Sequence, residues 1–402
     1  MAVPQIVLAP KFDITDPALR EDPYPVYARL RAAGAACRGA PGQWVLTRHA
    51  DVAAMLRDRR LTKQLPPAYY RMAGASPALE RFLARMNLGR RDQHLARRVG
   101  GAFRAPAVAR LAEQMTGMVD ELLDDALQAT SFDLARGPAL RFPMTVMCEL
   151  IGIPAADREA LWPHAAALLA SFSDAAFLTE RELAEADRSL AWMQEYLGAL
   201  LAERRRRPAH DLISDIARVE PGRRPFTDEQ IVDSAIRVFY AGFETSKGML
   251  CNAVAALLEH PDQMARLRRD PALVPAAVEE SLRYDAPIQV SLRMATERVS
   301  VGERRINPGR VLVLLIGSAN RDERRFEHPD RFDISRRPNP HLSFGGGPNY
   351  CLGAALAKQE GVVALGRLLA RTATIELDGD PQRPGLVNLR GWTRLPIRVR
   401  PI

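Results

Sequence analysis

The sequence predicts a mainly α-helical fold with small β-sheets, and three observations support this fold class. Apolar residues recur at helical spacing through most of the 402-residue chain, whereas strand-like runs are short and few. One helical run is long enough to cross a whole domain. No repeat and no linker composition interrupts the chain, so we expect a single domain over residues 1–402, whose β-rich part covers about 35–62 and 286–318 together with the C-terminal strands.

Helices make up most of the expected elements. Amphipathic runs predict helices over 23–34, 49–57, 92–103, 107–128, 142–151, 156–170, 180–206, 228–259, 261–268, 274–284 and 352–371. Short apolar runs bounded by turn residues predict strands over 43–47, 288–293, 298–301, 304–306, 310–315, 373–377 and 396–400.

The run at 228–259 is the most informative helix. Thr227 and Gln230 are spaced as a capping box, and Pro261 lies just beyond the expected end. At about 1.5 Å per residue this helix measures roughly 48 Å. Gly242 lies near its middle, where a glycine costs about 1 kcal/mol relative to alanine and so has a packing or functional reason.

Polar residues follow this glycine in the segment AGFETS, residues 241–246. Two interpretations of Glu244 and Thr245 are open. In the first, Glu244 faces solvent and the Thr245 hydroxyl bonds to a carbonyl one turn earlier, as threonine often does in helices. In the second, both side chains serve a functional site in the domain interior.

A glycine-rich segment, HLSFGGGPNYCLG at 341–353, places Cys351 at the start of the helix expected over 352–371. A helix N-terminus carries backbone N–H groups without helical partners and a partial positive charge, so it stabilises a thiolate and lowers the pKa of the thiol. Cys351 therefore suits a metal ligand, although a buried thiol beside a capping loop is the simpler alternative.

Charge and cysteine content exclude several classes of protein. The net charge is +8, but the arginines are scattered rather than clustered with aromatic residues, so we expect no nucleic-acid partner. No run approaches the ~20 apolar residues of a membrane span and the N-terminus lacks a targeting signal, so a cytoplasmic protein is expected. No CxxC pair is present, which argues against a zinc site and a disulfide framework; the cysteines are Cys37, Cys148, Cys251 and Cys351.

Five residues of the cysteine segment share the spacing F-G-x-G-x-[H/R]-x-C-x-G: Phe344, Gly345, Gly347, Cys351 and Gly353. This motif resembles the haem-ligand loop of the cytochrome P-450 family of haem-thiolate monooxygenases, and the chain looks like the soluble bacterial type. The resemblance implies the cytochrome P-450 fold, a triangular helical domain with a long central helix over the haem. It makes Cys351 the iron ligand and Phe344, Gly345 and Gly353 part of the cofactor site. One position departs from the pattern, because Asn349 stands where the family usually has a His or Arg that donates to a haem propionate.

The segment 241–246 is similar to the family motif [A/G]-G-x-[D/E]-T, which lies over the oxygen-binding face of the haem. The resemblance places Ala241 beside the haem and gives the Thr245 hydroxyl a role in dioxygen activation. It assigns Glu244 to the route that delivers protons.

Four residues match positions that contact the two haem propionates in the family: His94, Arg98, Arg293 and His341. His94 and Arg98 lie one helical turn apart, as in the family's H-x-x-x-R helix, although residues 90–93 depart from the usual D-P-P-x. Glu280 and Arg283 match the family's E-x-x-R pair, and Arg331 matches its third member. The resemblance implies that these last three have a structural role.

The resemblance implies a monooxygenase that uses haem b and dioxygen to hydroxylate or epoxidise a small molecule. Electrons are expected from a ferredoxin and its reductase, with NAD(P)H as the source, and the protein is expected to be a monomer. A basic face with Arg97, Arg104 and Lys358 is a candidate docking surface for this acidic partner. The segments that the family uses for recognition give a largely apolar lining here: Phe172, Phe239, Ala241, Ile288, Val290 and Leu292. Such a lining favours a steroid, terpenoid, fatty acid or polyketide.

Two other functions remain open. A peroxide-driven enzyme of the same family would be active with hydrogen peroxide and inactive with a reductase. A haem-binding sensor or scaffold protein would bind haem and turn over no apolar ligand.

Overall fold

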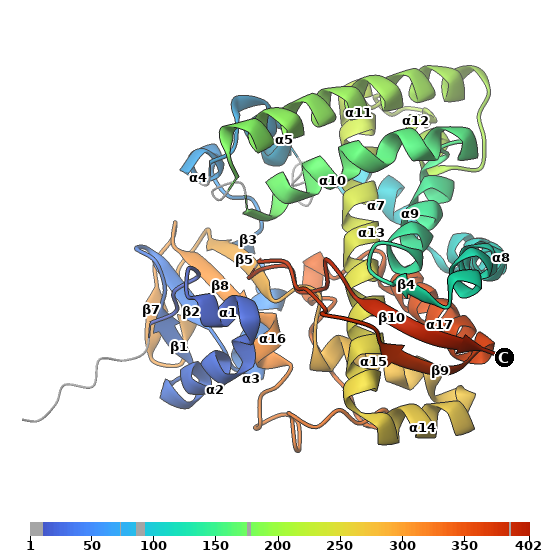
Figure 1. Ribbon diagram of the computed structural model, residues 1–402. Coiled ribbons are helices and arrows are strands. Elements are labelled where there is room, and N and C mark those ends of the chain that lie inside the picture. Colours follow the sequence, from blue (N-terminus) through green and yellow to red (C-terminus); the bar gives the residue numbers. More distant parts are fainter. Residues whose placement is uncertain (1–10, 73, 86–92, 175–177, 386) are drawn as a thin grey trace, which may run out of the picture. The chain divides into compact units, whose positions relative to one another are not determined.

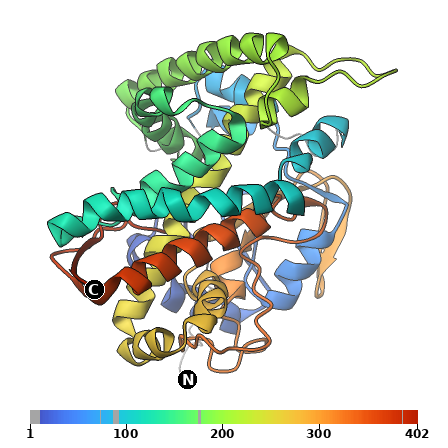
Figure 2. The same cartoon turned by 90° about the vertical axis from the view of Figure 1, so that its right-hand side faces the viewer.

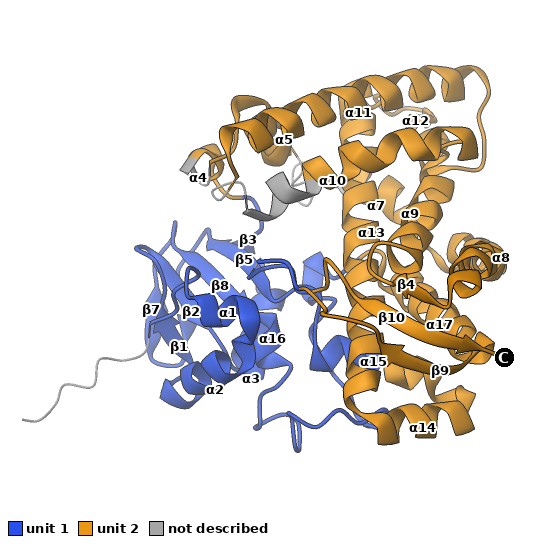
Figure 3. Ribbon diagram, viewed as in Figure 1, with its two compact units in different colours: residues 1–64, 279–351, 383–390 blue, residues 65–278, 352–382, 391–402 orange. Residues whose placement is uncertain are grey.

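The computed structural model describes residues 11–72, 74–85, 93–174, 178–385 and 387–402 (Figure 1). The chain forms two compact units (Figure 3). Unit 1 comprises residues 1–64, 279–351 and 383–390, and unit 2 comprises residues 65–278, 352–382 and 391–402. Among the helices of the described residues, none combines the length and the apolar character needed to cross a membrane.

Unit 1 is built on a β-sheet with short helices. The sheet has five strands in the order β1-β2-β8-β5-β3, in which β2 and β8 are parallel and the other neighbours antiparallel. The elements of unit 1 are α1 (Pro17–Glu21), α2 (Pro23–Ala33), β1 (Ala36–Arg38), β2 (Gln43–Leu46), α3 (His49–Arg57), β3 (Leu61–Thr62), β5 (Val290–Ala295), β6 (Val299–Val301), β7 (Arg304–Ile306), β8 (Val311–Leu315), α16 (Ile316–Ala319) and the 3-10 turn η4 (Gly347–Asn349).

Strand β8 lies inside this sheet, and both of its faces are buried. Leu312 and Leu314 point into a core shared with α3, whereas Val313 and Leu315 point into a second core shared with α2. Successive side chains of a strand alternate between the two faces of a sheet. The unbroken apolar sequence VLVLL is therefore what a strand covered on both faces requires.

Unit 2 is mainly helical. Helix α13 contacts α9, α11 and α17, and α8 runs side by side with α17 (Figure 2). A sheet of three strands has the order β4-β10-β9. The elements of unit 2 are α4 (Pro67–Met72), α5 (Pro77–Arg85), α7 (Gln93–Gly101), α8 (Ala105–Ala129), β4 (Ser131–Asp133), α9 (Pro138–Ile151), η1 (Ala155–Asp157), α10 (Arg158–Asp174), α11 (Glu180–Arg206), α12 (Leu212–Ala217), α13 (Asp228–Glu259), α14 (Pro261–Arg269), η3 (Pro271–Leu273), α17 (Ala354–Arg371), β9 (Thr372–Leu377) and β10 (Pro396–Pro401). Helix α15 (Val274–Tyr284) belongs to unit 2 up to residue 278 and to unit 1 from residue 279.

Helix α13 begins and ends where the sequence predicts. The Thr227 Oγ1 accepts a hydrogen bond from the Gln230 N–H at 3.2 Å, and the Gln230 Oε1 accepts one from the Thr227 N–H at 2.9 Å. This reciprocal capping box satisfies two N–H groups that the first helical turn leaves without partners. Gly242 has a packing reason, because a Cβ there would lie 2.0 Å from the sulfur of Met147 in α9.

The long helices and most strands of the sequence-based prediction are confirmed within a few residues. Strand β5 covers 290–295 rather than 288–293. The prediction lacks the short elements α1, α4, α5, α12, α16, β1, β3 and β4. Most of these are too short to carry a periodic pattern, and pairing with a neighbour decides whether a short strand forms.

Candidate active site

The loop that precedes α17 holds Cys351 in unit 1. The Cys351 N–H donates to the Phe344 carbonyl at 2.9 Å, which closes the loop, and the cysteine side chain is exposed. Gly345 and Gly347 have φ values of +74° and +61°, in the left-handed region that favours glycine. A Cβ on Gly347 would also lie 2.7 Å from the Cα of Arg57, so this turn tolerates no side chain.

The same unit holds a buried cation, Arg293, whose surroundings show whether the residues suit a haem. The Arg293 side chain on β5 is 2% exposed, and its Nη1 donates to the Ser291 hydroxyl and the Leu292 carbonyl, both at 2.8 Å. Burial lowers the pKa of Arg293 to about 10, and among the described residues no carboxylate forms an ion pair with it. A buried charge is costly unless it meets an opposite charge. A thiol suited to iron and a guanidinium suited to a carboxylate therefore fit the donor chemistry of haem.

His341, the other predicted propionate contact in unit 1, has both ring nitrogens engaged. Its Nδ1 accepts a hydrogen bond from the Ser343 N–H at 3.3 Å. Because Nδ1 accepts, Nε2 must carry the proton, and it lies 2.7 Å from Oε2 of Glu279. His341 therefore already donates to a carboxylate within this unit.

His94 and Arg98 lie in unit 2 on α7, where a carboxylate also meets them. The Glu220 carboxylate lies 3.5 Å from His94 Nε2 and 3.3 Å from Arg98 Nη1. Arg98 also donates to the carbonyl of Arg218. The one-turn spacing on α7 thus gives the two side chains a common carboxylate partner, and that partner is Glu220 of the chain.

A polar cavity of about 560 Å³ opens beside this cluster in unit 2. Its lining is rich in arginine and consists of His94, Arg97, Arg98, Gly101, Arg104, Asp215, Arg218, Glu220 and Arg223. Five arginines against two carboxylates make this cavity strongly basic.

The polar segment of α13 agrees with the structural interpretation at Thr245 but not at Glu244. The Thr245 hydroxyl donates to the Ala241 carbonyl at 2.9 Å, as in the structural interpretation. Glu244, however, does not face solvent, because its side chain is 13% exposed and lies 2.9 Å from Lys247 Nζ. Burial raises the pKa of Glu244 above its ordinary value, although Lys247 opposes this effect.

Sequence reasoning missed a second carboxyl group, which contacts Ser246, the residue after Thr245. The Ser246 hydroxyl donates to Oε2 of Glu360 on α17 at 2.5 Å. Glu360 is 1% exposed, and burial raises its pKa to about 8, so it is largely protonated at neutral pH. One signal was available, because Glu360 stands four residues after Leu356 on the apolar face of the predicted helix.

The structural cluster around Glu280 requires one correction. Arg283 donates to both Glu280 oxygens at 2.8 Å, and both side chains are buried. The second guanidinium, and so the third member of the cluster, comes from Arg336, whose Nε lies 3.2 Å from Glu280, and not from Arg331. Arg331 is exposed and contributes only its carbonyl, which accepts from Arg283 and Arg336. The motif spacing could not reveal how the chain turns after Arg331.

Some of the predicted substrate contacts are buried, and others keep accessible surface. Phe239 is 0% exposed and packs against Tyr240 and Phe243, so its side chain has no accessible surface. Val290 is buried in the second core of unit 1. Three predicted contacts keep accessible surface, namely Ala241, Ile288 and Leu292. The side chain of Phe172 lies outside the described part of the chain, as do residues 86–92 and 175–177.

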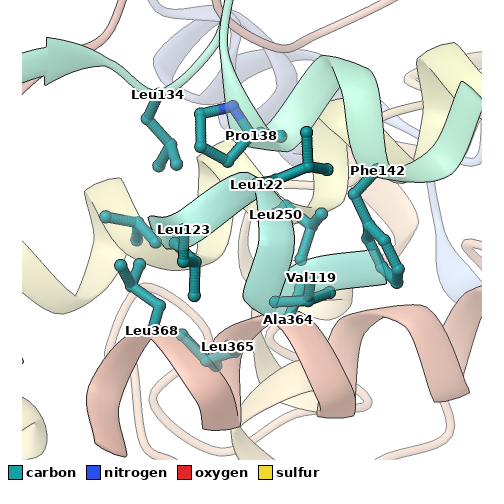
Figure 4. Close-up of a pocket in the computed structure, with 12 residues that line it drawn as sticks. Val119, Leu122, Leu123, Leu134, Pro138, Phe142, Leu250, Ala364, Leu365 and Leu368 are labelled. Atoms are coloured by element: carbon teal, nitrogen blue, oxygen red, sulfur yellow. The ribbon is translucent and has the colours of Figure 1, made fainter. Parts of the chain in front are cut away.

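An apolar pocket lies between four helices of unit 2 (Figure 4). Val119, Phe142, Leu250 and Leu365 line it from α8, α9, α13 and α17. Its volume is about 30 Å³, whereas pockets for small organic ligands measure several hundred Å³. This pocket is therefore too small for the substrate.

Comparisons with known proteins identify the family. Residues 164–384 match the family described as Cytochrome P450. The chain is 37% identical over 404 residues to a putative cytochrome P450 123 of Mycobacterium bovis, with 99% of this chain and 98% of that protein covered. It is 33% identical over 389 residues to the biotin biosynthesis cytochrome P450 of Bacillus subtilis, with 94% of this chain and 96% of that protein covered.

Solved structures show the same fold. The crystal structure of CalO2 gives a TM-score of 0.89 at 32% identity and covers 97% of this chain and 99% of that chain. The crystal structure of P450BioI in complex with hexadec-9Z-enoic acid ligated acyl carrier protein gives a TM-score of 0.87 at 31% identity, covering 95% of this chain and 100% of that chain. Sequence and fold together show that the chain belongs to the cytochrome P450 family of haem-dependent monooxygenases.

Proposed function

We propose that this cytochrome P450 uses haem b, takes its electrons from a ferredoxin system and inserts one oxygen atom into a largely apolar small molecule. One observation carries the proposal: unit 1 combines an exposed Cys351 thiol in a glycine-bounded loop with a buried Arg293 that has no carboxylate partner among the described residues. When bound, haem supplies the dioxygen chemistry, and a thiolate ligand favours cleavage of the O–O bond.

The cationic and imidazole side chains would hold the haem carboxylates. Arg293 suits this role because a guanidinium can form two parallel hydrogen bonds to one carboxylate. His341 in unit 1, and His94 with Arg98 in unit 2, already bind carboxylates of the chain. To meet a haem carboxylate, these residues must exchange or share their glutamate partners.

Three consecutive residues of α13 would handle protons. Glu244 has a raised pKa, so it holds a proton at a higher pH than a surface glutamate does. The Thr245 hydroxyl can rotate from the Ala241 carbonyl toward another acceptor. Ser246 connects the same turn of helix to Glu360, which keeps its proton near neutral pH. We therefore propose Glu244 and Thr245 as catalytic residues and Glu360 as a positioning residue and proton reserve.

The arginine-rich cavity of unit 2 favours the proposal that the electron donor is an acidic ferredoxin. Arg97 and Arg104 line it together with Arg218 and Arg223. Complementary charge steers association and is screened by salt. Reduction by ferredoxin should therefore slow as ionic strength rises, and a rate that is independent of salt would contradict this docking surface.

The thiolate ligand is tested first. The purified protein is reduced and exposed to carbon monoxide, and we expect the far-shifted absorption band of thiolate-bound haem. Cys351→Ala should lose this band, and the control Cys37→Ala, at a partly exposed cysteine, should keep it. A wild-type protein without the band would overturn the proposed function.

The electron source is tested on the same holoenzyme. Oxygenation of an apolar ligand should require NAD(P)H, a ferredoxin and its reductase. Activity with hydrogen peroxide and none with the reductase system would favour the peroxide-driven alternative. Haem binding without turnover of any ligand would favour the sensor alternative.

A further inference from the structure

Lys247 lies in the middle of helix α13, three residues after the proposed catalytic residue Glu244. Its neighbours in the sequence, Ser246 and Gly248, are both buried. The Lys247 side chain is only 13% exposed, as is that of Glu244. Lysine is rarely withdrawn from water to this extent unless it is paired with an opposite charge. The family motif on this helix ends at Thr245, so it does not account for a cation at position 247.

Lys247 binds the carboxylate of Glu244 directly. Its Nζ donates a hydrogen bond to Oε1 of Glu244 at 2.9 Å, and the two side chains form an ion pair. An ion pair on an exposed helix face is weak, because water screens the charges. Here both partners are mostly withdrawn from water, so their attraction is stronger than at the surface. The pair therefore determines where the Glu244 carboxylate is held.

Lys247 is the charged group that acts on Glu244 in the part of the chain that the structure describes. The main packing partners of α13 are α9, α11, α12, α14, α17 and β9, and no described residue on these elements shifts the pKa of Glu244. Burial raises this pKa, whereas the charge and the hydrogen bond of Lys247 lower it. The buried carboxyl group of Glu360 on α17 contacts Ser246 instead.

The hydrogen bonds of Glu244 and Thr245 run in opposite directions along α13. Glu244 accepts from Lys247, three residues later, whereas the Thr245 hydroxyl donates to the Ala241 carbonyl, four residues earlier. Among the described residues, no hydrogen bond joins Glu244 to Thr245. To pass a proton to Thr245, the carboxyl group of Glu244 must first leave Lys247. Charge-assisted hydrogen bonds are roughly twice as strong as neutral ones, so a protonated Glu244 leaves Lys247 more readily than an ionised one.

We propose that Lys247 is a positioning residue that holds the ionised Glu244 carboxylate away from Thr245 and releases it when Glu244 takes up a proton. The proton comes from water, and Lys247 keeps its own proton throughout. The inference rests on the proposed function, in which Glu244 and Thr245 deliver protons. It adds that Lys247 sets the pH above which this delivery slows, because Glu244 then stays ionised and paired.

Infrared difference spectroscopy of the ferric holoenzyme tests the proposal. Every protein carries Glu360→Gln, so that this neighbouring buried carboxyl group does not contribute. The C=O stretch of protonated Glu244 is assigned by its loss in Glu244→Gln, and its intensity is followed against pH. Lys247→Met and Lys247→Gln should each raise the midpoint by at least about one pH unit, because a nearby cation lowers the pKa of a carboxyl group by about that much or more. Lys247→Arg keeps the charge and should leave the midpoint close to that of the parent protein.

Lys11→Met, at an exposed lysine, removes the same charge and should leave the midpoint unchanged. A midpoint that stays in place in Lys247→Met and Lys247→Gln, or that moves equally in Lys11→Met, overturns the proposal. The carbon monoxide spectrum separates the two proposals. A normal thiolate band with an unmoved midpoint contradicts only the role of Lys247, whereas a missing band in the wild type contradicts the proposed function.

The release of Glu244 is tested by the pH dependence of coupling. The fraction of NAD(P)H electrons recovered in product should fall as pH rises, and in Lys247→Met this fall should occur at a higher pH than with Lys247 in place. A residue that only stabilised the helix would leave the pH of this fall unchanged. The same pH of half-maximal coupling in both proteins would therefore overturn the role of Lys247.

Discussion

Ser246 on α13 donates a hydrogen bond to Glu360 on α17 over 2.5 Å. This hydrogen bond connects the helix that carries Thr245 to the helix that follows the cysteine loop. The Glu360 Oε1 is buried and has no hydrogen-bond partner among the described residues. An ionised carboxylate in this position would leave a charge without compensation, which explains why burial raises the pKa to about 8.

The first prediction concerns the pH dependence of stability. The folded pKa of Glu360 lies above its unfolded value of 4.5, so the folded state binds the additional proton between pH 4.5 and about 8. The free energy of unfolding should therefore fall by a few kcal/mol as pH rises through this window. Glu360→Gln should flatten the dependence, measured by urea unfolding at pH 5 and pH 8. Glu376→Gln, at an exposed position on β9, is the control, and a dependence equal in all three proteins would contradict the assignment.

The second prediction concerns Thr245. Thr245→Ala removes a hydroxyl whose hydrogen bond is to its own helix, so the fold and the haem spectrum should be unchanged. If the hydroxyl assists proton delivery, the fraction of NAD(P)H electrons recovered in product should drop several-fold while hydrogen peroxide rises. Thr245→Ser keeps a hydroxyl and should retain most of the coupling. Equal coupling in the alanine variant and the wild type would refute the role.

The third prediction concerns haem uptake. Glu220 holds His94 and Arg98, which are also the proposed ligands of haem carboxylates in unit 2. Glu220→Gln removes the competing charge, so the apoprotein should bind added haem several-fold more tightly, as followed by the growth of the haem absorption band. Asp215→Asn removes a charge from the same cavity without an ion pair to either residue and should change little. Weaker haem binding in Glu220→Gln would show that Glu220 supports the site rather than competes for it.

The fourth prediction concerns acid stability in unit 1. Burial alone would raise the pKa of Asp285, but Arg390 at 2.6 Å and Arg383 at 3.0 Å outweigh it and hold the pKa at about 2. The stabilisation is fully present above pH 3.8, the unfolded value, and is lost as pH falls toward 2. Its size is about 2 kcal/mol from this shift. At pH 6, Asp285→Asn should unfold at a lower urea concentration than the wild type. Between pH 6 and pH 3, this variant should lose less stability than the wild type does, whereas the exposed Asp380→Asn should behave as the wild type.

Local chemistry explains which parts of the fold could be predicted from sequence. Thr227 and Gln230 form a cap from adjacent residues, so the start of α13 is readable without tertiary information. Strand β3 has two residues and exists because it pairs with β5, which no local pattern reveals. The same holds at the site: the sequence locates its residues but does not show which side chains they contact. The motif locates Cys351, but the choice of Arg336 over Arg331 depends on a turn, and the protonation of Glu360 depends on burial.

Strand β8 is apolar on both faces, and this has a consequence for mutational tolerance. A slip of one residue would exchange its two faces at little hydrophobic cost, so burial alone cannot fix its pairing register. Contacts just after its C-terminal end fix the register instead. The Gln289 carbonyl accepts a hydrogen bond from the Ile316 N–H at 2.8 Å, and a Cβ on Gly317 would lie 1.9 Å from the side-chain Oε1 of Gln289. Aliphatic residues along the strand should be interchangeable in library selections, whereas a replacement of Gly317 should be accepted only where the Gln289 side chain can move.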